Sequence, residues 1–284
     1  METSSKSQPV SVQPLDHALL GQALGLSQAL HWPYRLEDWA FALELGHGLA
    51  VVRDGQLCGT ALWWPYGDDV AAIGMIIVAE QAQRQGIGAA LMGELLRQTA
   101  GRCRVLNSTE EGYALYARLG FVPYGAVHQH QAVLGPAPEP AKDWRIRDPQ
   151  AADWPILRAL DRDASAMERD NLVGALAAVG AFQVIERAGA VCGYGCRRAW
   201  GRGWVIGPVV APDAEAAQAL IAALAQGLEG AFVRIDVPRA SGLSPWLEAI
   251  GLPQVGAVTA MSLGPPPESR GEARLFALSN QSLG

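Results

Sequence analysis

The sequence repeats itself at an offset of about 130 residues. Three pairs of segments share this spacing: VVRDGQLCG with VIERAGAVCG, IGMIIVA with IGPVVA, and LYARLGF with WLEAIGL. The offset is 134 residues from Cys58 to Cys192, 133 from Ile73 to Ile206 and 131 from Gly120 to Gly251. Three matches at nearly one offset indicate a tandem duplication of one folding unit.

The first copy has the pattern of an α/β unit. It predicts strands at 10–13, 49–53, 57–64, 71–78 and 104–107, helices at 17–30, 36–45, 87–100 and 113–119, and closing strands after them. That order predicts a mixed sheet with helices on both faces, an α+β arrangement within the α/β class. The segment LGPAPEPAKDW is rich in Pro and Ala and has no period, as a linker would. We therefore expect a first domain at 1–135, a linker at 136–143 and a second domain at 144–284.

The composition excludes several classes of partner. Half of the 284 residues are hydrophobic and 18% are charged, which is ordinary for a packed domain. A net charge of −6 argues against nucleic acid, whose phosphates need clustered Lys and Arg. No apolar stretch reaches the roughly 18 residues of a membrane span, and METSSKSQPVSVQP lacks the apolar core of a signal peptide. We expect a cytoplasmic protein, a monomer or a homodimer, that binds neither nucleic acid nor membrane.

No metal site is expected. Only Cys192 and Cys196 of the four cysteines lie close in sequence, and no third ligand joins them. All four are expected to be reduced and packed as small apolar residues. His128 and His130 alternate on a closing strand and are expected at the surface.

A glycine turn separates the apolar run IGMIIV from a helical pattern. A P-loop would continue with Gly-Lys-Ser/Thr, whereas here Gly86 is followed by Ile87, Gly88 and Ala89. The dinucleotide fingerprint would place Gly or Ala where Leu91 stands, and the usual acidic residue is also missing. Both of these readings fail.

The same turn, Gln83-Arg84-Gln85-Gly86-Ile87-Gly88, resembles the acetyl-CoA signature of the GNAT N-acetyltransferase superfamily. Its physical logic stands independently of the name. Glycines let a pyrophosphate approach the backbone N–H groups closely, and these groups open a helix whose dipole favours negative charge.

A second motif downstream is similar to the same superfamily. LYARLGF resembles its Leu-Tyr-x-x-x-Gly-Phe segment, and the resemblance implies that Tyr116 faces the thioester sulfur and acts as general acid. Tyr113 remains the weaker alternative. The resemblance implies acetyl-CoA as co-substrate and a cofactor-binding set of Ile76, Ile77, Val78, Gln83, Arg84, Gln85, Gly86, Ile87, Gly88, Ala89 and Asn107.

The second copy lacks these chemical groups. It reads VAPDAEAAQALIAAL where the first reads VAEQAQRQGIGAAL, so glycines are absent and Asp213 and Glu215 would repel phosphate. Leu247 stands opposite Tyr116. The resemblance therefore implies a tandem member with a degenerate C-terminal GNAT-like domain.

The expected reaction is acetyl transfer from acetyl-CoA to a primary amine in a direct ternary complex. Asp69, Glu80 or a chain of waters could serve as general base, and the sequence does not choose among them. The acceptor is left open. The alternative is a non-catalytic acyl-CoA sensor or interaction module.

Overall fold

The computed structural model describes residues 10–140 and 143–284. Residues 1–9 of the expected tail and residues 141–142 of the expected linker lie outside the described residues. The chain divides into two compact units: one holds the chain up to Trp63 and Met75–Ala100, and the other holds Trp64–Gly74 and Gly101–Gly284. Strands β3 and β4 contribute residues to both units. The expected domains 1–135 and 144–284 remain a prediction.

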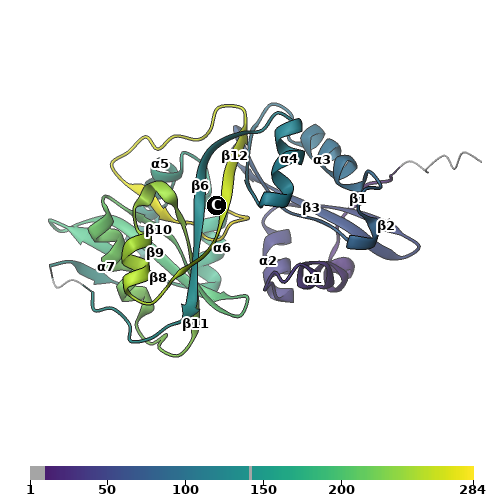
Figure 1. The fold of residues 1–284 in the computed structure, drawn as a ribbon. Coiled ribbons are helices and arrows are strands. Elements are labelled where there is room, and N and C mark those ends of the chain that lie inside the picture. Colours follow the sequence, from purple (N-terminus) through teal and green to yellow (C-terminus); the bar gives the residue numbers. More distant parts are fainter. Residues whose placement is uncertain (1–9, 141–142) are drawn as a thin grey trace, which may run out of the picture. The chain divides into compact units, whose positions relative to one another are not determined.

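The first unit is a small antiparallel sheet with helices on both faces (Figure 1). Its elements are β1 (Gln13–Pro14), α1 (Leu20–Ala29), α2 (Leu36–Glu44), β2 (His47–Arg53), most of β3 (Gln56–Tyr66), the end of β4 (Val70–Val78) and α3 (Ile87–Gln98). The buried side of α3 is formed by Ile87, Leu91, Met92 and Leu95. This spacing places them on one helical face, which explains the helix that the sequence predicts.

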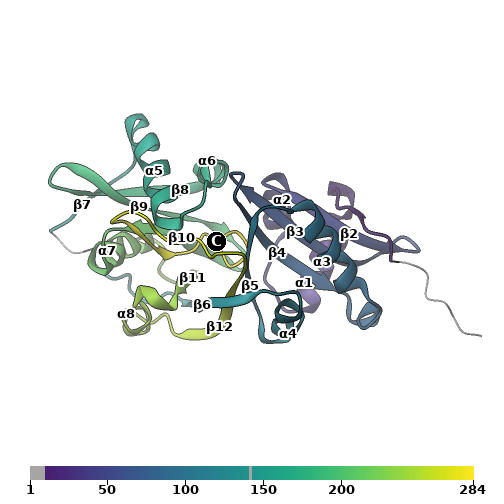
Figure 2. The same ribbon diagram turned by 90° about the horizontal axis from the view of Figure 1, so that it is seen from above.

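The second unit contains the remaining elements. These are β5 (Cys103–Ser108), α4 (Glu110–Arg118), β6 (Val122–Val133), β7 (Arg145–Arg147), α5 (Trp154–Ser165), α6 (Asp170–Val179), β8 (Gly180–Arg187), β9 (Ala190–Trp200), β10 (Gly203–Ala211), α7 (Ala214–Ala225), β11 (Phe232–Pro238), α8 (Ser244–Ala249), β12 (Gln254–Leu263) and β13 (Arg274–Ala277). Figure 2 shows α5 and α6 on one side of strands β8–β11 and α7 and α8 on the other. No described helix has the length and apolar character needed to cross a membrane.

The two sequence copies exchange their last strands inside the second unit. β12 pairs antiparallel with both β5 and β6, and β6 pairs antiparallel with β11 (Figure 2). Each closing strand therefore lies beside a strand of the other copy. The start of β4 extends this sheet by pairing in parallel with β5, from Val70–Cys103 to Ile73–Leu106. The mixed α/β architecture with helices on both faces of the strands is as the sequence predicts.

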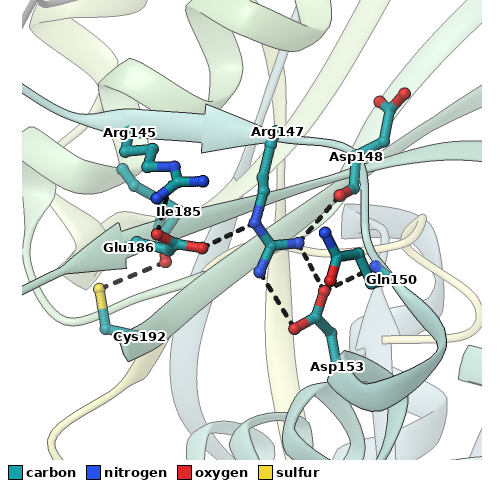
Figure 3. Close-up of polar contacts among 8 residues, drawn as sticks. All are labelled: Arg145, Arg147, Asp148, Gln150, Asp153, Ile185, Glu186 and Cys192. Carbon is teal, nitrogen blue, oxygen red and sulfur yellow. Dashed lines mark hydrogen bonds and ion pairs between the residues drawn. The ribbon is translucent and has the colours of Figure 1, made fainter. Parts of the chain in front are cut away.

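An ion-pair network fastens β7 to β8 and to the turn before α5 (Figure 3). Arg147 bonds Glu186 at 2.6 Å and Asp153 at 2.6 and 3.1 Å. Asp153 also accepts the backbone N–H of Gln150 at 2.6 Å. The bonds from Arg147 and from the Gln150 N–H hold the pKa of Asp153 below its usual value. This network fixes the first strand of the second copy at the edge of the sheet.

All four cysteines are free thiols. Cys192 lies at the side of the network in Figure 3, where its Sγ donates to the carbonyl of Ile185 at 3.6 Å. Cys196 is fully buried, and burial raises its pKa to about 12. A buried thiol of high pKa is unreactive, so Cys196 acts as a small packed side chain.

Candidate acetyl-CoA site

The turn between β4 and α3 has a backbone suited to an anion. Arg84 (φ +60°) and Gly86 (φ +80°) both adopt left-handed conformations, which are typical of anion-binding backbone turns. No side chain caps the start of α3 at Gly86, and a methyl group added there would meet no described atom within 4 Å. The first N–H groups of α3 are therefore open to a ligand, and the helix dipole favours a negative one.

Side chains around the turn hold its shape. Gln83 Nε2 donates to the carbonyl of Val78 at 3.4 Å, and Gln85 accepts a hydrogen bond from Arg53. Arg84 is exposed and forms no hydrogen bond or ion pair within the described part of the chain. Its guanidinium is therefore available to a phosphate oxygen.

The predicted cofactor residues of the first unit differ in exposure. Ile77 and Ile87 are buried, Ile76, Val78 and Gly88 are half-buried, and Gln83, Arg84, Gln85, Gly86 and Ala89 are exposed. The buried side chains of Ile77 and Ile87 pack inward, so only the backbone of these two residues remains for a ligand.

A backbone irregularity precedes this segment in β4. Met75 has a φ of +51°, and Thr60 Oγ1 donates to the Met75 carbonyl at 2.9 Å. The neighbouring Gly59 lets α3 approach the strands, because a Cβ there would lie 3.0 Å from the Ile77 carbonyl and 3.0 Å from Ile87 Cγ2. A left-handed residue inside a strand redirects the peptide groups around it, as at a β-bulge. The end of β4 therefore presents backbone groups outside the regular ladder.

Tyr116 lies in the second unit, on α4. Its side chain is 9% exposed and meets the ring of Phe121 edge to face, with 6.0 Å between centroids. Burial alone raises the pKa of Tyr116 to about 12. The hydroxyl forms no hydrogen bond among the described residues. The Tyr116 hydroxyl is therefore protonated at neutral pH and free to donate a hydrogen bond. Tyr113, the alternative, is 39% exposed.

Asn107 also lies in the second unit, at the end of β5. Its Nδ2 donates to the carbonyl of Gln281 at 2.8 Å. It lines a cavity of about 690 Å³, together with residues of β6, β12 and the segment 275–284. The structure thus places Asn107 in a cavity wall, a position that its spacing in the sequence could not reveal.

The start of α7, the counterpart of α3, is filled by the chain itself. Asp213 accepts the N–H of Ala216 at 2.9 Å and pairs with Arg187. Burial opposes ionisation here, but these two bonds hold the pKa of Asp213 below its usual value. A carboxylate therefore caps the N-terminus of α7. Leu247, at the position of Tyr116, is fully buried.

The expectation that His130 lies at the surface is wrong. His130 is fully buried: its Nδ1 donates to the Leu252 carbonyl at 2.9 Å, which leaves Nε2 to accept Ser244 Oγ at 3.0 Å. His128 Nδ1 lies 3.0 Å from the same hydroxyl. The strand exchange places β6 between two other strands and beneath α8, so His130 faces the core. Ser244 and the histidines lie 114 and 116 residues apart, and no local pattern signals the contact.

Two segments of the chain match acetyltransferase families. Residues 18–121 match the acetyltransferase (GNAT) family, and residues 157–277 match an acetyltransferase (GNAT) domain. An uncharacterized N-acetyltransferase of Bacillus subtilis (strain 168), YitH, is 29% identical over 172 residues. That match covers 60% of this chain and 61% of YitH, so it spans less than two thirds of the relative.

Solved structures share the fold along the whole chain. A protein of Pyrococcus horikoshii, named as a presumed acetyltransferase, has a TM-score of 0.81 at 18% identity and covers 100% of this chain and 99% of its own. A tandem GNAT protein from the clavulanic acid biosynthesis pathway has a TM-score of 0.65 at 16% identity, covering 90% and 99%. At these identities the likeness concerns the fold alone.

Proposed function

Since this chain carries two GNAT domains in tandem, we propose that it is an N-acetyltransferase that moves the acetyl group of acetyl-CoA to a primary amine in a direct ternary complex. The family match supports acetyl transfer in general. The primary amine, the ternary complex and the role of Tyr116 are our proposals.

The contrast between the two helix starts carries the proposal. At α3 the turn is open, left-handed at Gly86 and uncapped by any side chain, while at α7 Asp213 caps the helix and Arg187 pairs with the cap. In the first copy the start of α3 leaves space that an added side chain would occupy. In the second copy the start of α7 is capped by a side chain of the chain itself. The residues of the first copy thus fit the pyrophosphate of acetyl-CoA.

In the proposed reaction the chain positions the thioester and the amine and transfers protons. Backbone groups of Met75–Val78 bind the pantetheine and polarise the acetyl carbonyl as its oxygen gains charge. The neutral amine attacks this carbonyl; a C–N bond forms, the C–S bond breaks and the amine loses one proton. Tyr116 gives its proton to the departing thiolate, while Glu80, Asp69 or a water takes the proton of the amine.

An amine panel with purified protein tests the proposal. Coenzyme A release should require an acceptor, and initial rates against both substrates should give intersecting lines. Incubation with acetyl-CoA alone should leave the mass of the chain unchanged. Acetylation of Ser244, which has a histidine base at hydrogen-bond distance, would instead indicate a covalent intermediate. Binding of acetyl-CoA without turnover on any amine would favour a sensor.

Replacing Gly88 by Val should weaken acetyl-CoA binding by at least about tenfold, on the order of 1.4 kcal/mol. Gly88 is the second residue of α3, and a branched side chain there occupies the approach to the first N–H groups. Calorimetry with the variant gives the dissociation constant directly.

Gly93→Val is the matched control for this change. Gly93 lies on the same helix, is exposed, and has nothing within 4 Å of an added Cβ. Val costs no more than Gly in a helix, so both variants should fold. Equal losses of affinity in the two variants would place the effect on the helix and not on the turn.

One acetyl-CoA should bind per chain. The cap that Asp213 forms on α7 leaves no open anion site at the start of that helix. Calorimetric titration of the wild-type protein measures the ratio. Two equivalent sites would contradict the assignment of the second copy as degenerate.

A further inference from the structure

The second unit contains an open cavity that the acetyl-CoA residues of the first unit do not explain. Its volume of about 690 Å³ lies within the roughly 300–1,000 Å³ of small-molecule sites. Most of its wall is apolar, from residues such as Leu106, Val127, Met167, Leu275 and Leu278. A ligand of this cavity therefore has an apolar body.

Most polar groups of the wall are already engaged. Tyr66 donates its hydroxyl to the Leu283 carbonyl at 2.5 Å, Ser165 bonds the backbone of Met167, and Gln281 Nε2 donates to Asp236 at 3.1 Å. These bonds build the wall and leave little for a ligand.

Three side chains of the wall keep an available polar group, one of them the Tyr124 hydroxyl, which forms no hydrogen bond among the described residues. Asn107 uses Nδ2 on the Gln281 carbonyl, which leaves its Oδ1 as an acceptor. Arg239 is exposed just after β11, and its guanidinium forms no ion pair or hydrogen bond among the described residues. The cavity thus offers the Asn107 acceptor, which suits an amine N–H, the Tyr124 hydroxyl, and one guanidinium, which suits a carboxylate.

The charge of the wall further restricts the chemical class of the ligand. Arg239 has the single charged side chain of the wall, and no described Asp or Glu side chain lines the cavity. A polyamine or an aminoglycoside carries several positive charges and would meet no Asp or Glu side chain among the described residues of this wall. A carboxylate on the ligand would instead pair with the guanidinium of Arg239.

We propose that this cavity binds the acceptor, and that the acceptor is an amine with an apolar body and a carboxylate group, as in an amino acid. The amine contacts Asn107 Oδ1 and the carboxylate contacts Arg239. This assigns Asn107 to the acceptor in place of its predicted role with the cofactor. The assignment of the cavity as an acceptor site rests on the proposed function, whereas its ligand chemistry can be measured without turnover.

Calorimetry in the presence of coenzyme A tests the proposal with matched probes. Phenylalanine and aminocaproate carry the carboxylate at short and long separation from the amine, and phenethylamine and pentylamine are their decarboxylated counterparts. At least one acid should bind about tenfold more tightly than its counterpart, and spermidine should bind weakly. Arg239→Gln should remove this preference. Arg158→Gln, a change of the same charge at an exposed residue of α5 away from the cavity, should keep it.

Equal binding of acids and counterparts, preference for spermidine, or equal effects of the two Arg variants would each overturn the proposal. Acetyl transfer assays with the same probes separate it from the proposed function. Carboxylate-dependent binding without transfer to any amine leaves the ligand class standing and rejects the transferase. Transfer to phenethylamine or pentylamine at rates that depend neither on a substrate carboxylate nor on Arg239 would support the transferase and reject the proposed ligand class.

Discussion

The Tyr116→Phe protein should transfer acetyl groups about 10²–10⁴-fold more slowly than wild type, the usual loss for a general acid. The change keeps the ring and its edge-to-face contact with Phe121. It removes only the hydroxyl, which matters as the sulfur gains charge in the transition state. Acetyl-CoA affinity should therefore stay nearly the same, and steady-state kinetics with calorimetry measure both quantities.

The pH profile gives this prediction a second readout. Burial raises the pKa of Tyr116 to about 12, and a general acid works only while it is protonated. Its contribution is present below that pKa and is lost as the pH rises through it. Between about pH 7 and 10, where a free tyrosine would begin to titrate, Tyr116 should cause no alkaline decline.

Tyr113→Phe is the matched control on the same helix. Tyr113 is 39% exposed, so its hydroxyl should contribute little to the rate. Normal turnover in Tyr116→Phe, on an acceptor that the wild type uses, would assign the proton to a water or another side chain. A large loss in Tyr113→Phe alone would move the acid role to that residue.

Local patterns were enough to predict most elements and the glycine turn. The helix expected at 87–100 is α3 at Ile87–Gln98, and the strand expected at 71–78 is β4 at Val70–Val78. Hydrophobic periodicity fixes which side of an element is buried, and glycines mark where the backbone is left-handed. Asp213 is one of the two acidic residues that the sequence predicts to exclude phosphate. In the structure its side chain caps α7.

Strand partners could not be predicted in the same way. Periodicity shows that β6 and β12 are strands, but a duplicated sequence offers each of them two equivalent neighbours. The pairing of β12 with β5, and of β6 with β11, is decided by contacts far apart in the chain. The burial of His130 and the position of Asn107 in the cavity wall both follow from these pairings and were out of reach for the same reason.

Asp161→Ala should lower the free energy of unfolding by about 3–5 kcal/mol, the usual cost of leaving a buried charge without its partner. Asp161 bonds the fully buried Arg169 at 2.7 and 3.0 Å and accepts the hydroxyl of Tyr194. Burial lowers the pKa of Arg169 and Asp161 raises it, so removing the carboxylate leaves a buried guanidinium without its partner. Urea unfolding measures the loss.

A second pair in the same segment supplies the control. Arg162 and Asp170 lie the same eight residues apart, but their side chains are 42% and 43% exposed. Water solvates the Arg162 guanidinium that remains when its partner is removed. Asp170→Ala should therefore lower the free energy of unfolding by about 1 kcal/mol or less. Equal losses in Asp161→Ala and Asp170→Ala would show that burial does not set the strength of the first pair. Replacing Arg169 by Met in the Asp161→Ala background should restore part of the stability, because the unpaired charge is then gone. Ser165 and Met167 lie between Asp161 and Arg169 in the sequence and line the cavity, so Asp161→Ala should also weaken ligand binding there. The Arg169→Met change should restore part of that binding.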